Sequence, residues 1–341
     1  MEKQINECIL SPKDYASTQE VKWCPGCGDY AIINAMKKAL SELCLQKENT
    51  AFISGIGCSS RFPYYMDTYG FHTIHGRPLA IATGTKIANP NLDVFVISGD
   101  GDALAIGGNH FIHAIRRNVN LNVIVFNNQI YGLTKGQYSP TSEIGSKTKS
   151  SPHGTIEHPF SVGELALGAK TGFYARVVDT DIKMMVEVIK EAYNYNGLSV
   201  IEVLQNCVIF NDKVHDVITN KETKLNNQLY LKHNEPMLFG ENNDMGLILD
   251  GLNLKVVKIG EEGITENNVL KHDATSKSNI LHQMLVQMKL PDFPIALGVI
   301  RNCASEESYD DKLHHQIADE KQKSSFKSLN ELFFHGNTFK V

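Results

Sequence analysis

The sequence predicts an α/β fold built on a doubly wound, mostly parallel sheet. Short apolar runs bounded by turn residues alternate with segments whose apolar residues recur at helical spacing, which is typical of α/β proteins. The runs are also apolar at consecutive positions, as expected for strands that are covered on both faces. Because ligands of such sheets bind beyond the carboxyl ends of the strands, polar residues that follow a run are candidate site residues.

Predicted strands and helices alternate along the first two thirds of the chain. The first helix is predicted at residues 30–45, where Ile33, Met36 and Leu40 recur at helical spacing. The clearest strand is predicted at residues 93–98, where apolar residues follow one another without interruption. The other predicted elements are strands at residues 51–56, 121–126, 175–178 and 199–204, and helices at residues 108–118 and 182–193.

The character of the chain changes after residue 212. Residues 213–243 are polar and weakly periodic, which indicates a long connection. A helix is predicted at residues 278–289 and a strand at residues 294–300. We therefore divide the chain into an N-terminal arm (residues 1–22), an α/β domain (23–212), a C-terminal extension with its linker (213–303) and a charged tail (304–341).

Charge and hydropathy exclude several classes of partner. The 341 residues carry a formal net charge of −5 and contain no long block of Lys and Arg, so we expect no nucleic acid partner. No apolar run approaches the roughly 18 residues that a membrane span requires. The first nine residues are charged and lack the apolar stretch of a secretory signal. We expect a cytoplasmic protein that does not contact a membrane.

Four of the seven cysteines follow predicted strands or lie in glycine-rich loops. Cys24 and Cys27 form a CxxC motif, Cys58 follows a Gly-Ile-Gly turn, and Cys207 follows the strand that ends at residue 204. Thiolates from such loops could converge on one iron–sulfur cluster at the edge of the sheet. The CxxC motif alone is also compatible with a redox disulfide or with half of a zinc site. We expect Cys44, near a helix end, to be a buried free thiol.

A second motif has the ligand types that magnesium and diphosphate require. The sequence Gly-Asp-Gly-Asp follows one predicted strand, the pair Asn-Asn ends the next strand, and Asp100 and Asn128 are 28 residues apart. One helix and one strand fit between them, so both side chains return to the same edge of the sheet. Their oxygens, with the backbone carbonyl of Ile130, suit Mg²⁺, and the glycines let backbone N–H groups approach phosphate. Gly-Asp pairs also occur in ordinary turns, but the combination with Asn-Asn at this spacing favours a cofactor site.

Taken together, the motifs resemble a known enzyme family. Gly-Asp-Gly followed by Asn-Asn at this distance resembles the signature of thiamine diphosphate enzymes. The whole constellation resembles the β subunit of 2-oxoacid:ferredoxin oxidoreductases, closest to the 2-oxoglutarate:ferredoxin oxidoreductase (2-oxoglutarate synthase) type. It comprises residues 23–27, 57–60, 75–77, 99–102, 127–137 and 206–207. The resemblance covers residues 23–212 and resumes at residues 272–301, whereas residues 220–268 and the tail resemble little in the family.

The resemblance implies a site made of three sets of residues within the fold of thiamine-diphosphate-binding domains. A [4Fe–4S] cluster would be held by Cys24, Cys27, Cys58 and Cys207. Mg²⁺ would be held by Asp100, Asn128 and the backbone of Ile130. Thiamine diphosphate would be contacted by Ile56, Gly57, Cys58, Ser59, His75, Gly101, Asp102, Gly132 and Leu133, with His75 as a catalytic residue.

The activity implied by the resemblance is the oxidative decarboxylation of a 2-oxoacid. Coenzyme A would collect the acyl group, and ferredoxin would take the electrons from the iron–sulfur cluster. In this family the glutamate that faces the aminopyrimidine ring lies on another subunit, and this sequence contains no clear candidate for it. We therefore expect an α subunit, and possibly further subunits, as partners and an inactive chain in their absence.

Two basic residues lie where they could select a dicarboxylic substrate. Arg61 follows Cys58 in one glycine-rich loop, and Lys135 lies within residues 131–137, directly after the expected magnesium ligands. The second carboxylate of 2-oxoglutarate needs a cationic partner, which Arg61 could provide bidentately. Alternatively, both residues could be surface charges or could bind the phosphates of coenzyme A.

Three other functions compete with this interpretation. The first is an enzyme of the same family that prefers pyruvate or accepts a broad range of 2-oxoacids. The second is a non-redox thiamine diphosphate decarboxylase or carboligase, a class that does not need the cysteine set. The third is a zinc-binding or redox scaffold protein, which would bind no thiamine cofactor.

Overall fold

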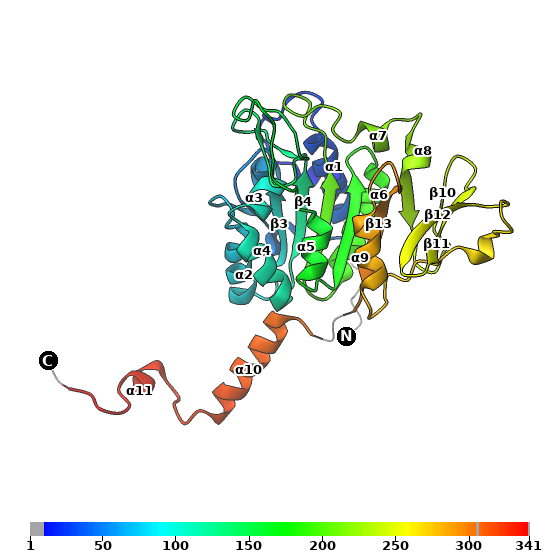
Figure 1. Ribbon diagram of the computed structural model, residues 1–341. Helices are drawn as coiled ribbons and strands as arrows, with labels where there is room; N and C mark the ends of the chain where they lie inside the picture. Colours follow the sequence, from blue (N-terminus) through cyan, green and yellow to red (C-terminus); the bar gives the residue numbers. More distant parts are fainter. Residues whose placement is uncertain (1–9, 305–306, 340–341) are drawn as a thin grey trace.

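An eight-stranded sheet forms the centre of the computed structural model, which describes residues 10–304 and 307–339 (Figure 1). Its strands are β1 (Thr50–Ser54), β2 (Tyr69–His72), β3 (Asp93–Gly99), β4 (Asn122–Asn127), β7 (Phe173–Val178), β8 (Ser199–Leu204), β9 (Gln228–Leu231) and β13 (Ile295–Asn302). Their order is β2-β1-β3-β4-β8-β7-β13-β9, and every pair is parallel except β13 with β7. The predicted doubly wound, mostly parallel sheet is therefore confirmed.

Helices cover both faces of this sheet. On one face α1 (Asp29–Glu42) packs against α6 (Ile182–Asn194). The other face is covered by α2 (Pro78–Ala88), α4 (Gly108–Arg117), α5 (Val162–Gly168) and α9 (Ile280–Gln287). Each face of the sheet packs against its helices in a separate hydrophobic core. Alternate residues of β3 belong to different cores: Val94 and Val96 face α2, α4, α5 and α9, whereas Phe95 faces α1 and α6.

The predicted elements lie close to the observed ones, but several observed elements were not predicted. Helix α5 was not predicted, and residues 213–243, which were expected to be a long connection, contain β9, the strand at one edge of the main sheet. Residues 69–88, which carry β2 and α2, were not predicted as elements; β2 is exposed along its whole length and so shows no core pattern. The Gly-Asp-Gly motif is not a turn before a later helix, because α3 (Asp100–Leu104) begins at Asp100. Strand β13 does not form a separate unit; it joins the main sheet beside β7.

The rest of the chain surrounds this core. A three-stranded sheet contains β10 (Leu238–Phe239), β11 (Met245–Asp250) and β12 (Asn253–Lys258), and a hairpin contains β5 (Ile130–Tyr131) and β6 (Gln137–Tyr138). Short helices are α7 (Asp216–Thr219) and α8 (Lys224–Asn227), and 3-10 segments span Pro12–Tyr15, Lys47–Asn49, Ser59–Tyr65 and Glu266–Asn268. In Figure 1 the tail helices α10 (Tyr309–Lys323) and α11 (Leu329–Phe333) extend away from the body.

Some expectations concern residues that the structure does not describe. Residues 1–9 of the N-terminal arm and residues 305, 306, 340 and 341 of the tail lie outside the described residues. Within the described ranges, no helix combines the length and the hydropathy needed to cross a membrane.

Candidate active site

The four predicted cluster cysteines line one cavity of ≈ 200 Å³, which we call the cysteine cavity. Cys24 and Cys27 lie in the turn before α1, which the hydrogen bond from the Cys27 N–H to the Cys24 carbonyl closes at 3.0 Å. Cys58 begins the 3-10 segment after β1, and Cys207 follows β8. The structure therefore brings together four thiols from three loops at the carboxyl edge of the sheet.

Hydrogen bonds fix these loops relative to one another. The Trp23 indole N–H donates to the Cys58 carbonyl at 2.7 Å, which joins the CxxC turn to the loop after β1. The Gly28 N–H donates to the Asn206 carbonyl at 3.3 Å, which joins the same turn to the loop after β8. Gln205 also donates from Nε2 to the Cys27 sulfur at 3.3 Å. The thiols are therefore held in place by the protein itself.

Burial disfavours thiolates in this cavity unless a cation is present. Burial raises the pKa of Cys58 to about 11, with the nearby Asp29 carboxyl as the next cause. Burial also raises the pKa of Cys27, again with Asp29 as the second cause. A metal centre would reverse this by holding the thiolates directly. Among the described residues, no group of three or more His, Cys, Asp or Glu side chains is arranged to hold a metal ion.

A neighbouring cavity of ≈ 230 Å³ is lined by the expected cofactor contacts, and we call it the aspartate cavity. Four loops form it, after β2, β1, β3 and β4, because the carboxyl ends of these adjacent parallel strands meet at one edge. The nine expected thiamine diphosphate contacts line it, and so do the three expected magnesium ligands Asp100, Asn128 and Ile130. Residues that line both cavities are Cys58, Asn128, Gly132 and Leu133.

Asp102 organises one side of the aspartate cavity. Its Oδ1 accepts the N–H of Ile56 at 3.1 Å and the N–H of Gly76 at 2.7 Å. The same oxygen accepts Nδ1–H of His75 at 2.7 Å, and Oδ2 accepts the Ser98 hydroxyl at 2.6 Å. Asp102 was expected to contact the cofactor. It lines the cavity, and its carboxylate also holds the loops after β1 and β2 together.

Asp100 also lines the aspartate cavity and is only 2% exposed. Burial raises the pKa of Asp100 to about 6, although hydrogen bonds from Ser139 and Thr141 act in the opposite direction. Asn128 donates from Nδ2 to the Gln205 side chain at 2.7 Å, so its Oδ1 is oriented away from Gln205. Sequence reasoning missed Ser139 and Thr141, because they are 39 and 41 residues from Asp100 and no motif links them to it.

The two candidate substrate residues lie in different places. Arg61 lines the cysteine cavity, beside Cys58, and is not among the residues that line the aspartate cavity. Lys135 lines neither of the two cavities and is exposed in a tight turn closed by its N–H bond to the Gly132 carbonyl at 3.0 Å. Cys44 is half-buried and takes part in a disulfide, so the expectation of a buried free thiol there was wrong.

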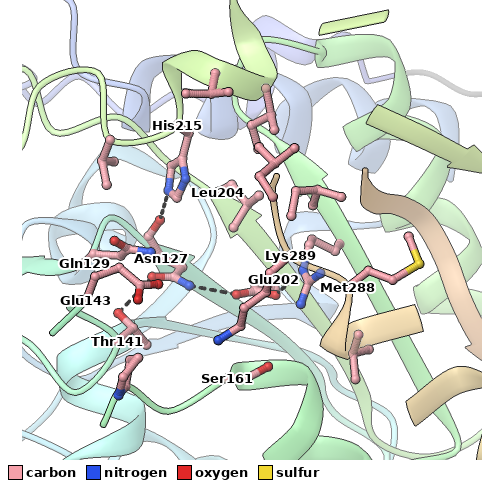
Figure 2. A pocket seen from close by; sticks show the side chains of 18 of the residues that line it. Asn127, Gln129, Thr141, Glu143, Ser161, Glu202, Leu204, His215, Met288 and Lys289 are labelled. Atoms are coloured by element: carbon pink, nitrogen blue, oxygen red, sulfur yellow. Dashed lines mark hydrogen bonds and ion pairs between the residues drawn. The ribbon is translucent and has the colours of Figure 1, made fainter. Parts of the chain in front are cut away.

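A third cavity, of ≈ 360 Å³, was missed by sequence reasoning; we call it the arginine cavity (Figure 2). Arg176 and Glu202, paired on neighbouring strands β7 and β8, form a buried ion pair at its wall with Nε to Oε2 at 2.7 Å. Glu202 also accepts from Asn127 Nδ2 at 2.7 Å, and His215 donates from Nε2 to the Asn127 carbonyl at 3.0 Å. Figure 2 shows Asn127 between His215 and Glu202. The sequence does carry a signal for this ion pair, because Arg176 and Glu202 are each the one charged residue in an otherwise largely apolar strand.

Comparison with known proteins agrees with this geometry. Residues 55–203 match the family model of the C-terminal, thiamine-pyrophosphate-binding domain of thiamine pyrophosphate enzymes. The chain is 48% identical over 306 residues to the 2-oxoglutarate oxidoreductase subunit KorB of Mycobacterium tuberculosis, a match that covers 89% of this chain and 81% of the relative. It is 48% identical over 190 residues to subunit beta of the 2-oxoacid:ferredoxin oxidoreductase 1 of Aeropyrum pernix. That match covers 56% of this chain and 60% of the relative.

A solved structure is similar over nearly the whole chain. It is a 2-oxoglutarate:ferredoxin oxidoreductase from Magnetococcus marinus with 2-oxoglutarate, coenzyme A and succinyl-CoA bound, with a TM-score of 0.76 and 30% identity. The similarity covers 97% of each chain. One conclusion follows from the residues of the two adjoining cavities, from the match to the thiamine pyrophosphate domain and from these similarities. The chain belongs to the family of the β subunits of 2-oxoacid:ferredoxin oxidoreductases.

Proposed function

We propose that this protein is the β subunit of a cytoplasmic enzyme that oxidatively decarboxylates 2-oxoglutarate to its acyl-CoA and CO₂ and passes the electrons to ferredoxin. One observation carries the proposal: the expected cofactor and magnesium residues line a single cavity, and that cavity shares residues with the one lined by four cysteines. The names of the Mycobacterium relative and of the Magnetococcus structure, which include 2-oxoglutarate, support the choice of substrate.

The residues present fit both cofactors. Cys24, Cys27, Cys58 and Cys207 would hold a [4Fe–4S] cluster, because all four thiols line one cavity and thiolates are the usual ligands of such clusters. Mg²⁺ would be held by Asp100, Asn128 and the Ile130 carbonyl, and thiamine diphosphate by the nine residues of the aspartate cavity. When bound, thiamine diphosphate supplies the electron sink for decarboxylation and the cluster supplies one-electron steps.

His75 is the proposed catalytic residue of this chain. Its Nδ1 carries the proton that is donated to Asp102, so Nε2 is the nitrogen available to the contents of the aspartate cavity. In this tautomer Nε2 can accept a proton from a substrate or cofactor group, and Asp102 stabilises the resulting cation. Asp102 thus orients His75 and keeps the proton on Nδ1.

We further propose that Arg61 and Lys135 select the substrate, by pairing with the distal carboxylate of 2-oxoglutarate. Arg61 is the stronger candidate, because it lies beside Cys58, a residue shared by the two cavities. The α subunit would supply the glutamate that faces the aminopyrimidine ring. A pyruvate-preferring enzyme of the same family is the second candidate. It is favoured by the position of Arg61 on the cysteine cavity and of Lys135 outside both cavities.

The test combines composition with turnover. The chain is produced anaerobically with and without its partner subunit, and iron, acid-labile sulfide, thiamine diphosphate and 2-oxoacid-dependent viologen reduction are measured. We expect about four irons per β chain, activity with 2-oxoglutarate and coenzyme A only for the assembled enzyme, and none for the chain alone. Zinc in place of iron, or decarboxylation without electron transfer to the dye, would contradict the proposal. Higher activity with pyruvate would favour the second candidate.

A further inference from the structure

Two hydroxyl groups converge on one oxygen of the proposed magnesium ligand. Oδ2 of Asp100 accepts Ser139 Oγ–H at 2.5 Å and Thr141 Oγ1–H at 2.6 Å. All three residues are 2% exposed. Ser139 and Thr141 are not among the residues that line the aspartate cavity, so they contact the Asp100 carboxylate from behind. They are therefore placed to orient this carboxylate without touching the cofactor.

The proton of Thr141 has two acceptors within reach. Asp100 Oδ2 lies at 2.6 Å and Asn127 Oδ1 at 3.0 Å. A hydroxyl has a single proton, and the ionised carboxylate is both the closer and the stronger acceptor, so Thr141 donates to Asp100. The bond from Asn127 Nδ2 to the buried Glu202 keeps Asn127 Oδ1 turned towards Thr141, as the more distant and weaker of the two acceptors.

The short loop that carries both hydroxyls is itself anchored. Within residues 139–142, the Ser139 N–H donates to Ser142 Oγ at 2.8 Å. Ser142 in turn donates its hydroxyl proton to the Gln129 carbonyl at 2.6 Å. Gln129 lies between the two other proposed magnesium ligands, Asn128 and Ile130. The loop that holds Asp100 is thus tied to the segment that holds its co-ligands.

We propose that Ser139 and Thr141 are positioning residues for Asp100. By occupying Oδ2 they would leave Oδ1 as the oxygen available to Mg²⁺ in the proposed site. Mg²⁺ demands near-ideal octahedral geometry, so a carboxylate that rotates freely would bind it more weakly. This inference rests on the proposed magnesium site, and it adds residues outside the motifs that indicated that site.

The test measures cation dependence and not turnover. The assembled enzyme is stripped of cofactor and cation, and thiamine diphosphate binding is followed calorimetrically at increasing Mg²⁺ concentration. For Thr141→Val, which nearly keeps the shape, we expect the Mg²⁺ concentration for half-maximal binding to rise roughly 10- to 100-fold, as for other residues that orient metal ligands. Ser139→Ala should act in the same direction. Thr141→Ser restores the hydroxyl and should lie within about 3-fold of wild type, because the donated hydrogen bond is kept.

The outcomes of this titration distinguish a role in orienting the Asp100 carboxylate from a role in folding. A positioning role predicts that saturating Mg²⁺ restores full binding stoichiometry in Thr141→Val. An unshifted Mg²⁺ dependence in both Thr141→Val and Ser139→Ala overturns the inference. The inference is also overturned if the Thr141→Val enzyme loses thiamine diphosphate binding sites at every Mg²⁺ concentration and Thr141→Ser loses them as well. Asp100→Asn tests the underlying site: wild-type thiamine diphosphate affinity in that variant would refute the magnesium proposal itself, whereas weak binding there with unshifted Thr141→Val would refute only the positioning role.

Discussion

The cysteine cavity and the aspartate cavity adjoin at one edge of the sheet but differ in chemistry. The first is lined by soft sulfur donors, and one of them, Cys24, is exposed. The second is lined by hard oxygen donors and backbone groups, and its carboxylates Asp100 and Asp102 are each 2% exposed. Soft thiolates favour iron–sulfur clusters, whereas carboxylate and carbonyl oxygens favour Mg²⁺. The same loops thus offer two separate metal chemistries.

The boundary between these cavities is thin. Cys58 and Gly132 line both of them. A Cβ atom added at Gly132 would lie 3.5 Å from the Cys207 sulfur and 3.6 Å from the Cys58 sulfur, so Gly132 lies next to both sulfurs with room for little more than a methyl group. Under the proposed function, electrons would therefore have only a short distance to travel from the aspartate cavity to the cysteine cavity, and each proposed metal site would have its own donor set.

The largest expected effect comes from removing one soft donor that belongs to the cysteine cavity alone. Cys24→Ala should abolish cluster incorporation and viologen reduction, because a cluster with three protein thiolates loses a ligand on its exposed side. Binding of thiamine diphosphate should persist, since Cys24 does not line the aspartate cavity. Iron analysis and calorimetry of the assembled enzyme measure the two effects.

The matched control for this experiment is Cys303→Ala. Cys303 is a free, half-buried thiol that lines neither cavity, so iron content should not change. The same iron assay applies to Cys27, Cys58 and Cys207. Full retention of iron in any one of these variants would remove that residue from the ligand set.

The next effect should come from the aspartate cavity. Asp102→Ala leaves the N–H groups of Ile56 and Gly76 and the Ser98 hydroxyl without their acceptor, and each such loss costs about 1–3 kcal/mol. We expect a loss of about 3 kcal/mol or more in the free energy of unfolding, measured by urea denaturation, and greatly weakened thiamine diphosphate binding. The exposed Asp292→Ala should change stability by less than about 0.5 kcal/mol. Normal cofactor binding in Asp102→Ala would contradict its organising role.

Sequence reasoning found both of these cavities because of one topological rule. Cys58, Asp100, Asn128 and Cys207 each follow a predicted buried strand, and parallel strands bring their carboxyl ends to one edge. Nothing in the local pattern reveals Ser139 and Thr141, because their role depends on a loop folding back onto α3.

For the fold as well, local sequence patterns predict individual elements but not contacts between distant segments. Helical and strand periodicity located β3, β4, β7 and β8, whose residues are nearly all buried. Periodicity could not show that β13 enters the sheet antiparallel to β7, since strand pairing over more than a hundred residues leaves no mark on local spacing. The Arg176–Glu202 pair could have been suspected, because isolated opposite charges in apolar strands require a partner.

A smaller effect should show which cavity Arg61 serves. If Arg61 pairs with the distal carboxylate, Arg61→Met should lower kcat/KM for 2-oxoglutarate by roughly one to three orders of magnitude, the size of losing a charge-assisted pair. Activity with pyruvate or 2-oxobutyrate should fall much less. An equal fall for all three substrates would assign Arg61 to the cluster side, where it lies beside Cys58. Iron content of the variant, measured in parallel, separates these two roles.

The smallest expected effect lies outside both cavities, at the buried His272. His272 is fully buried, donates from Nε2 to the Val299 carbonyl at 2.9 Å, and its Nδ1 has no hydrogen-bond partner among the described residues. Burial lowers the pKa of His272 from its ordinary 6.5 to about 4. Between these values only the unfolded chain binds the proton, so stability falls as the pH falls from 6.5 towards 4, and no effect is expected above 6.5.

At pH 5, which is about 1.5 units below the ordinary value, this histidine should cost about 2 kcal/mol relative to pH 7. Urea denaturation at the two pH values measures the loss. His272→Gln keeps a donor for the Val299 carbonyl but does not titrate, so its stability should depend less on pH by about the same amount. If His272→Gln and the wild-type protein lose stability equally between pH 7 and pH 5, the acid sensitivity belongs to other groups. Asp29 and Asp100 would not account for such a loss, since burial raises the pKa of both carboxyls, and a raised carboxyl pKa favours the folded state as the pH falls.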